Sequence, residues 1–295
     1  MNSFSSYEKF QQIREQTESE RQAANRPHEV LYFHKVDDPY SHLTIQCLEQ
    51  LESSYEITLK FILVGEENLE TVHEPSLYNI YCLQDVNRIA PFYNIDFQAH
   101  EYPAKELVEK ANSILTAAKS DDLIEIANKV NSALWEGDIG TLDKLSSTYF
   151  ATMAEVKENL IQGNKIRDAK GYYFGSAFYY EKELYWGVDR LPYLEERLAE
   201  LGAKKAHEIQ NICPLELKAP IKFTSDKKVN LYYYPSLNSP YTFVSTKRVR
   251  QMREDYPINL ITKPVLPMLM RMMTIPGFKA KYIISDAARE GRRHN

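Results

Sequence analysis

The chain has 295 residues, of which 43% are hydrophobic and 26% charged, a composition typical of a soluble globular protein with more than one domain. No apolar run approaches the roughly 18 residues of a membrane span. The first 27 residues lack the basic, apolar and small-residue zones of a secretion signal. Three scattered cysteines and seven histidines without ligand spacing predict neither a redox dithiol nor a metal site. We therefore expect a cytoplasmic protein that binds no membrane.

The formal charge of −5 is unevenly distributed along the chain. Residues 229–295 carry 11 Lys/Arg and 4 Asp/Glu, a net charge of +7, so the remainder carries −12. The basic residues alternate with apolar positions and form no continuous run, which disfavours a nucleic-acid surface. A pocket for small anions, or a surface that faces the acidic part of the chain, fits this pattern better.

Residues 1–27 predict a charged N-terminal helical arm with a short apolar stripe. A β-α-β unit follows. "EVLYFH" (29–34) predicts a strand, residues 39–54 predict a helix that begins at Pro-Tyr, and "YEITLKFILV" (55–64) predicts a second, buried strand. The helix-length crossover implies that the two strands are parallel.

Helical periodicity dominates residues 100–169, which we interpret as an all-helical insert. The sequence then returns to strands: "GSAFYY" and "ELYWG" are separated by Glu181-Lys182, the pattern of a hairpin. "DRLPYLEERLAELG" predicts a closing helix that ends at Gly202. Residues 28–202 thus predict an α/β domain with the order β-α-β, helical insert, β-β-α.

The chain also repeats itself. A shift of 201 residues places residues 28–94 on residues 229–295 without a gap and gives 13 identities. About 6% identity, or roughly four matches, is expected by chance. Pro39-Tyr40 falls on Pro240-Tyr241, and a Y-x-x-x-D-x-x-R pattern occurs in both segments. We infer a tandem duplication, with residues 203–228 as a linker and residues 229–295 as the β-α-β-α part of an incomplete second copy, because a complete one would run to about residue 403.

The element order and the Pro-Tyr helix start resemble the DsbA-like thioredoxin fold, and specifically the 2-hydroxychromene-2-carboxylate isomerases and kappa-class glutathione transferases. Three stretches carry the resemblance: Ser239-Pro240-Tyr241, the K-x-x-Y-x-x-x-D-x-x-R pattern that begins at Lys279, and "LYWGVDRLPYLEERL" (184–198). The resemblance implies a glutathione-dependent isomerase or transferase that acts on a small aromatic or anionic compound. It also implies glutathione as the cofactor and is compatible with a homodimer.

The same resemblance implies roles for individual residues. Ser239 would lie beside the glutathione sulfur as the catalytic residue, at a helix N-terminus that favours a thiolate. Lys279 would bind a glutathione carboxylate, with Tyr241 at the same site. Val188 and Asp189, in Gly-Val-Asp-Arg, would bind the γ-glutamyl end.

Three positions of the first copy depart from the family pattern. Asp38 stands where the family has Ser and would repel a thiolate. Tyr78 stands in the position of Lys279, and Ser176 replaces a cis-proline. These departures indicate that the first copy has lost its glutathione site, while the segments that would complete a site in the second copy are not in this sequence.

Simpler interpretations exist for the same residues. Ser or Asp before Pro is an ordinary helix N-cap, and we favour this role alone for Asp38. The Y-x-x-x-D-x-x-R residues have the spacing of ion pairs along one helix face. A non-catalytic thioredoxin-like binding module is therefore the alternative to an enzyme. A protein disulfide oxidoreductase ranks lowest, because the sequence contains no C-x-x-C.

Overall fold

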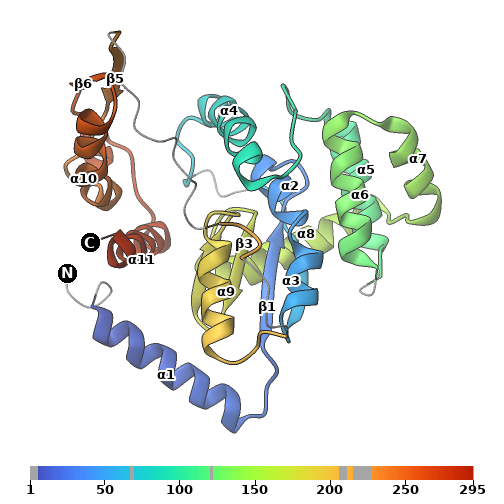
Figure 1. Cartoon of the computed structure of the whole chain (residues 1–295). Coiled ribbons are helices and arrows are strands. Elements are labelled where there is room, and N and C mark those ends of the chain that lie inside the picture. Colours follow the sequence, from blue (N-terminus) through green and yellow to red (C-terminus); the bar gives the residue numbers. More distant parts are fainter. Residues whose placement is uncertain (1–5, 67–69, 120–121, 206–210, 215–226, 295) are drawn as a thin grey trace. The chain divides into compact units, whose positions relative to one another are not determined.

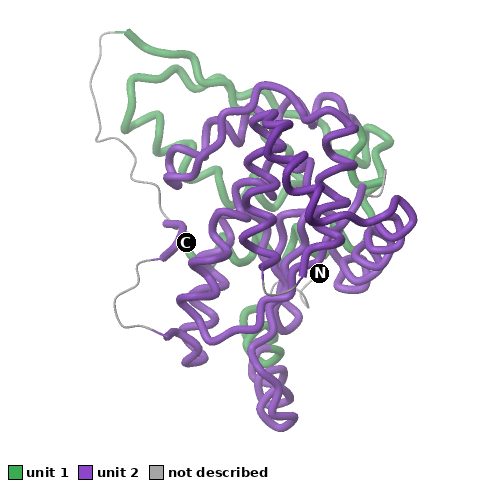
Figure 2. Tube along the Cα trace, turned by 90° about the vertical axis from the view of Figure 1, so that its right-hand side faces the viewer, with its two compact units in different colours: residues 1–13, 69–73, 218–295 green, residues 14–68, 74–217 purple. Residues whose placement is uncertain are grey.

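A computed structural model describes residues 6–66, 70–119, 122–205, 211–214 and 227–294. The chain divides into two compact units (Figure 2). Unit 1 comprises residues 1–13, 69–73 and 218–295, and unit 2 comprises residues 14–68 and 74–217. Most of the predicted linker, residues 206–210 and 215–226, lies outside the described residues. No helix among the described residues is long and apolar enough to cross a bilayer.

Unit 2 is built on a four-stranded mixed sheet with the strand order β2-β1-β3-β4. Its strands are β1 (Glu29–His34), β2 (Thr58–Leu63), β3 (Ala177–Tyr180) and β4 (Glu183–Trp186). β1 and β2 are parallel, whereas β3 runs antiparallel to β1 and β4. Glu181 and Lys182 join β3 to β4 with φ angles of 40° and 69°. Positive φ at both loop residues is the geometry of a type I′ turn, so the predicted hairpin is confirmed.

The helices of unit 2 follow the predicted order (Figure 1). They are α2 (Pro39–Ile45), α3 (Leu48–Ser54), α4 (Pro75–Tyr93), α5 (Lys105–Ala117), α6 (Leu123–Glu136), α7 (Ile139–Thr148), α8 (Met153–Ala169) and α9 (Leu191–Glu200). Helices α5, α6 and α7 pack on one another and form the core of the helical insert. The predicted α/β order of a β-α-β half, a helical insert and a β-β-α half is therefore confirmed.

The prediction of a single helix for residues 39–54 is wrong in one respect. The chain forms two short helices, α2 and α3, separated at Gln46 and Cys47. The Cys47 N–H donates to the Thr44 carbonyl three residues back at 3.0 Å, which tightens the chain into a turn. The Gln46 side chain bonds both the Asp96 carbonyl and the Asp96 N–H at the turn. These long-range bonds stabilise the break and cannot be recognised from local periodicity.

The core of unit 2 includes a buried polar group at the end of β1. His34 is fully buried; Tyr32 Oη lies 3.2 Å from its Nδ1, and Asn131 Nδ2 lies 2.9 Å from its Nε2. Burial, and then the neighbouring His42, lower the pKa of His34 to about 3. The ring is therefore neutral at physiological pH, and its hydrogen bonds link β1 to the helical insert.

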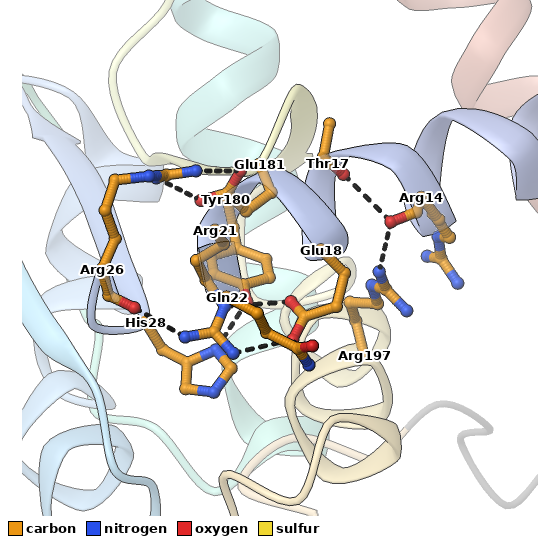
Figure 3. A network of polar contacts seen from close by, with 10 residues as sticks. All are labelled: Arg14, Thr17, Glu18, Arg21, Gln22, Arg26, His28, Tyr180, Glu181 and Arg197. Carbon is orange, nitrogen blue, oxygen red and sulfur yellow. Dashed lines mark hydrogen bonds and ion pairs between the residues drawn. The ribbon is translucent and has the colours of Figure 1, made fainter. Parts of the chain in front are cut away.

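Helix α1 (Tyr7–Ala23) lies where the helical arm is predicted, and its C-terminal part is held by ion pairs (Figure 3). Arg21 donates two hydrogen bonds, of 2.9 and 2.7 Å, to the carboxylate of Glu18. It also donates to the Arg26 carbonyl at 2.6 Å. Arg26 in turn pairs with Glu181 in the hairpin loop at 2.7 Å. Further members of this network are Arg14, Thr17, Gln22, His28, Tyr180 and Arg197. Within the helix, Arg14 binds Glu183 of β4 at 2.7 Å, so the helix is anchored to the β3-β4 hairpin by charge.

Unit 1 contains a second β-α-β-α segment. Its elements are β5 (Val229–Tyr233), α10 (Pro240–Asp255), β6 (Ile258–Thr262), the 3₁₀-helix η1 (Met268–Arg271) and α11 (Gly277–His294). β5 and β6 are parallel, with Leu231 opposite Leu260. This confirms the elements predicted for residues 229–295. α10 has no buried residue, and several large apolar side chains of this unit are exposed, including Leu237 at 86% and Met272 at 92%.

Helix α8 crosses β2 at a position where only glycine fits. A Cβ atom added to Gly163 would lie 1.9 Å from the Leu63 carbonyl oxygen and 3.3 Å from Cγ2 of Ile62. The adjacent Asn164 accepts a hydrogen bond from the Gly65 N–H at 2.9 Å, which keeps the helix close to the end of the strand. Helix α8 can approach β2 this closely only because Gly163 has no side chain.

We therefore expect Gly163→Ala to lower the free energy of unfolding by about 3 kcal/mol or more, because the strand or the helix must shift. Gly140→Ala in α7 is the matched control. Its added Cβ would meet nothing closer than 3.4 Å, so the change should be neutral or stabilising by up to about 1 kcal/mol. Denaturant unfolding of both variants measures the difference, and equal stabilities would contradict the packing.

Unit 2 also contains a buried carboxyl group, on helix α9. Glu195 of α9 is 1% exposed; it accepts from the Tyr55 hydroxyl at 3.2 Å and from the Ile212 N–H at 3.1 and 3.2 Å. Burial raises the pKa of Glu195 to about 7. A raised pKa means that the folded state binds this proton more tightly than the unfolded state. The protonated carboxyl therefore makes its full contribution to the free energy of unfolding below pH 4.5. This contribution is lost as the pH rises through 7.

Glu195→Gln should remove this dependence. Relative to the variant, the wild-type protein should lose stability between pH 5 and pH 8, by up to about 3 kcal/mol. Unfolding by denaturant at both pH values measures the difference. Glu196→Gln, which changes an exposed neighbour on the same helix, should show no such trend. An unchanged difference between wild type and Glu195→Gln at the two pH values would contradict the burial of an ionisable group here.

Candidate functional site

A tyrosine hydroxyl joins the Pro-Tyr helix to the following long helix in both units. In unit 2, Tyr40 Oη donates to Asp85 Oδ2 at 2.8 Å. In unit 1, Tyr241 Oη donates to Asp286 Oδ2, also at 2.8 Å. Burial, and then the neighbouring Cys82, raise the pKa of Tyr40, so this hydroxyl remains a donor. The two motifs that the sequence offered separately, Pro-Tyr and Y-x-x-x-D-x-x-R, therefore meet in one contact.

The predicted ion pair within that helical pattern is found in unit 1. Arg289 Nη1 lies 3.0 Å from Asp286 Oδ1, and both side chains are buried. Asp286 thus binds the arginine with one oxygen and the Tyr241 hydroxyl with the other. The sequence contained the signal for the tyrosine contact, a repeated Asp 45 residues after a repeated Tyr, but helical spacing alone pointed to Arg289.

In unit 2, the side chain of Asp38 caps the N-terminus of its own helix, α2. Its carboxylate accepts from the Tyr40 N–H at 3.3 Å and the Ser41 N–H at 3.0 Å, and from the Ser41 hydroxyl at 2.7 Å. A Cβ atom added to Gly175 would lie 2.8 Å from Ser41 Oγ and 3.1 Å from Asp38 Oδ2. The backbone before β3 therefore packs directly on the capped helix start, and the favoured role of Asp38 as an N-cap is supported.

Ser176, at the position where the family has its proline, is fully buried and has a φ angle of 55°. This left-handed conformation is unfavourable for a residue other than glycine. Its hydroxyl lies 2.7 Å from the Thr44 hydroxyl, and its carbonyl accepts from the Gly187 N–H at 2.7 Å. These two hydrogen bonds hold the residue in place and engage its hydroxyl and its carbonyl.

Aromatic rings fill the region next to Asp38. Tyr78 stacks on Phe174 with ring centroids 5.7 Å apart and an interplanar angle of 10°. Trp186 contacts both Phe174, at 5.8 Å, and Tyr40, at 5.0 Å. We call these four residues the aromatic cluster. Tyr78, which the sequence repeat aligns with Lys279, is thus packed among aromatic rings.

Val188 and Asp189, the residues expected at a γ-glutamyl site, follow β4 in unit 2. Val188 is buried at 2% exposure, so its side chain serves the core. Asp189 Oδ2 lies 2.6 Å from Nη1 of the adjacent Arg190. The two residues therefore share unit 2 with Asp38, Tyr78 and Ser176.

Ser239 begins α10 in unit 1 and has the extended backbone of an N-cap, with φ −87° and ψ 121°. Its Oγ accepts from the Thr242 N–H at 3.4 Å, a long hydrogen bond compared with the 3.0 Å at Asp38. Leu237 and Phe243, on either side, are exposed at 86% and 80%. The hydroxyl thus lies at a weakly capped helix start with exposed apolar side chains nearby.

Lys279 lies in the first turn of α11, half-buried, and its Nζ donates to the Thr71 carbonyl oxygen. Burial lowers the pKa of Lys279. His73, from the same short segment, contacts the Thr274 carbonyl with its Nε2 at 2.8 Å. The ammonium group is therefore fixed at the Thr71 carbonyl oxygen, which also belongs to unit 1.

The predicted site residues thus fall into two groups. Unit 1 holds Ser239, Tyr241 and Lys279, whereas unit 2 holds the remaining five: Asp38, Tyr78, Ser176, Val188 and Asp189. Two hollows on unit 2, of about 390 and 660 Å³, are lined by other residues, the first between α3 and α6 and the second around the end of α4.

No protein-family model and no curated protein matches the chain. Among solved structures, the chain is similar to 2-hydroxychromene-2-carboxylate isomerase, with 19% sequence identity, a TM-score of 0.41 and coverage of 59% of this chain and 96% of that one. It is also similar to a candidate protein disulfide isomerase from Nitrosomonas europaea, with 14% identity, a TM-score of 0.46 and the same coverage. At this level of similarity neither activity transfers to this chain.

Proposed function

We propose that the chain is a tandem thioredoxin-like protein in which residues 229–295 correspond to the first half of residues 28–202. Several contacts recur after a shift of 201 residues. Val30 opposite Leu59 in one sheet corresponds to Leu231 opposite Leu260 in the other. The hydrogen bond from the Val64 N–H to the His34 carbonyl, 2.8 Å long, has its counterpart between Val265 and Pro235 at 2.9 Å.

The helix starts support the same proposal. The Lys35 N–H donates to Ser41 Oγ at 3.3 Å, and the Ser236 N–H donates to Thr242 Oγ1 at 3.2 Å. The two tyrosine–aspartate contacts complete the series. Contacts that recur at one constant offset, in strands, turns and side chains alike, are more than a shared β-α-β topology requires.

In this proposal the first copy is a non-catalytic module. A bound thiolate at Asp38 would face a carboxylate, which repels it. That carboxylate already accepts three hydrogen bonds from its own helix. The aromatic cluster takes the place of a carboxylate-binding lysine. The observation that supports different roles for the two copies is a contrast at equivalent positions. The first copy has Asp38 and Tyr78 where the second copy has Ser239 and Lys279.

The second copy keeps two residues of a glutathione site of the isomerase or transferase type, Ser239 and Lys279. Ser239 would hold the sulfur at the start of α10, where its hydroxyl and the helix dipole both favour a thiolate. Lys279 would bind a carboxylate of the tripeptide in exchange for the Thr71 carbonyl. A half-buried ammonium group with a lowered pKa gains from pairing with an anion. The net positive charge of residues 229–295 favours an anionic ligand.

Glutathione, when bound, would supply a thiolate nucleophile that can add reversibly to an activated double bond. The chain's own residues would orient that sulfur and keep it deprotonated. Tyr241 would serve as a positioning residue, because its hydroxyl ties the start of α10 to Asp286 and thereby fixes Ser239 relative to α11. Small aromatic or anionic compounds are the proposed substrates.

A titration of reduced glutathione into the full chain tests this proposal. At about 100 times the dissociation constant, binding should stabilise the protein by about 2.7 kcal/mol and raise its melting temperature. Lys279→Ala should weaken binding at least about tenfold, since it removes a charge-assisted hydrogen bond. Ser239→Ala should weaken it as well.

Asp38→Ala is the control, because it changes the equivalent position of the first copy. It should leave the response to glutathione intact. No shift in the wild-type protein, or equal shifts in all four proteins, would sink the glutathione site. A shift lost in Asp38→Ala and kept in Ser239→Ala would reverse the proposed division of roles.

A further inference from the structure

Two buried cysteines from distant parts of the sequence meet in unit 2. Cys47 Sγ and Cys213 Sγ are 3.7 Å apart, and the residues are separated by 166 positions in the chain. Both are free thiols, with 4% and 0% of their surface exposed. The separation is a van der Waals contact and exceeds a disulfide bond by about 1.7 Å. Small rotations of the two side chains would therefore bring the sulfur atoms to bonding distance.

Hydrogen bonds fix Cys213 from its own side of this contact. The neighbouring Ile212 N–H donates to both carboxylate oxygens of Glu195, at 3.1 and 3.2 Å. Glu195 also accepts from the Tyr55 hydroxyl, which anchors it to the C-terminal end of α3. The residues around Cys213 are thereby held against the helix that follows Cys47.

Residues 203 and 205, which follow α9, are fixed in the same region. The Glu56 N–H donates to the Ala203 carbonyl at 2.6 Å, and the Lys205 N–H donates to the Ser54 carbonyl at 2.8 Å. Cys47 itself occupies the turn between α2 and α3, outside any continuous helix. Contacts on both sides therefore hold the two thiols face to face, and a turn residue such as Cys47 can adjust its side chain at little cost.

The third cysteine provides an internal contrast. Cys82 of α4 is equally buried, at 2% exposure, but it lies near the rings of Tyr40 and Tyr78. Burial raises the pKa of Cys82 to about 12. The close approach of Cys47 and Cys213 is thus not a general property of the cysteines of this chain.

We propose that Cys47 and Cys213 form a specific oxidation site, at which a hydroperoxide converts the two thiols into one intramolecular disulfide. In the first step one thiol attacks the peroxide oxygen, giving a sulfenic acid and releasing water or an alcohol. The second thiol then displaces hydroxide from that sulfur and loses its proton, so that the disulfide and one water are formed. The two sulfur atoms together give up two electrons, and the peroxide O–O bond accepts them.

The disulfide would close a loop of 166 residues and so constrain the unfolded chain. It would also fasten residues 211–214 to the turn before α3, independently of the Glu195 hydrogen bonds. Thiolates are the reacting form, and the hydrogen bond with Cys47, followed by burial, raises the pKa of Cys213. The reaction should therefore be slow at neutral pH and faster at higher pH.

The test uses the full chain treated with hydrogen peroxide at pH 8 under native conditions. Four proteins are compared: wild type, Cys82→Ser, Cys47→Ser and Cys213→Ser. Intact-mass measurement and a non-reducing peptide map then report the loss of two hydrogens and the residues that are joined. Wild type and Cys82→Ser should give one cross-link, between Cys47 and Cys213. Their melting temperatures should rise by about 5–10 °C and return after reduction with dithiothreitol.

Cys47→Ser and Cys213→Ser should show neither the cross-link nor the rise in melting temperature. A wild-type protein that gains oxygen without losing two hydrogens, or stays unmodified, would overturn the proposal. A cross-link through Cys82 would overturn it too. Since none of these readouts involves glutathione, the result is independent of the function proposed for Ser239 and Lys279.

Discussion

The hydrogen bond between a tyrosine hydroxyl and an aspartate carboxylate is the constraint around which both units are arranged. In each unit it joins the helix after the first strand to the helix after the second strand. The β-α-β unit fixes the strands, but by itself leaves the angle of the following helix open. A charge-assisted hydrogen bond in a partly buried position is strong enough to hold that angle. The start of the Pro-Tyr helix, where thioredoxin-like proteins place their chemistry, is thereby set against α4 in unit 2 and against α11 in unit 1.

The start of the Pro-Tyr helix has different surroundings in the two units. In unit 2 the helix start is closed by Asp38, by the backbone of Gly175 and by the aromatic cluster. In unit 1 the helix start carries a hydroxyl, exposed apolar neighbours and a half-buried lysine at the next helix. The proposed duplication would allow such a division, because one copy could lose its polar pocket and gain core packing while the other kept its charges. The proposed functions follow from this difference in local chemistry and not from the fold.

Much of the fold could be predicted from the sequence because its signals are local. Glu181-Lys182 between two aromatic strands specified the hairpin, and the apolar spacing of residues 100–169 specified helices. The break at Gln46 and the buried Glu195 could not be predicted, since each depends on a partner far along the chain, Asp96 in one case and Ile212 in the other. For the site, the sequence identified Asp38 as a cap but could not show that Tyr78 stacks on Phe174 or that Lys279 contacts Thr71. Such contacts arise from tertiary packing, which overrides any single-residue pattern.

The most direct test of this account is a pair of double-mutant cycles on the tyrosine–aspartate contacts. Tyr40→Phe and Asp85→Ala form one cycle, and Tyr241→Phe and Asp286→Ala form the other, each with its double variant and the free energy of unfolding as the readout. We expect a coupling energy of about 1.5–3 kcal/mol in both cycles, as for hydrogen bonds to charged groups. If neither cycle shows a coupling energy, the tyrosine–aspartate contacts do not constrain the two units, and this account is contradicted. Coupling in the first cycle alone would limit this constraint to unit 2 and remove the structural basis for treating the two segments as copies.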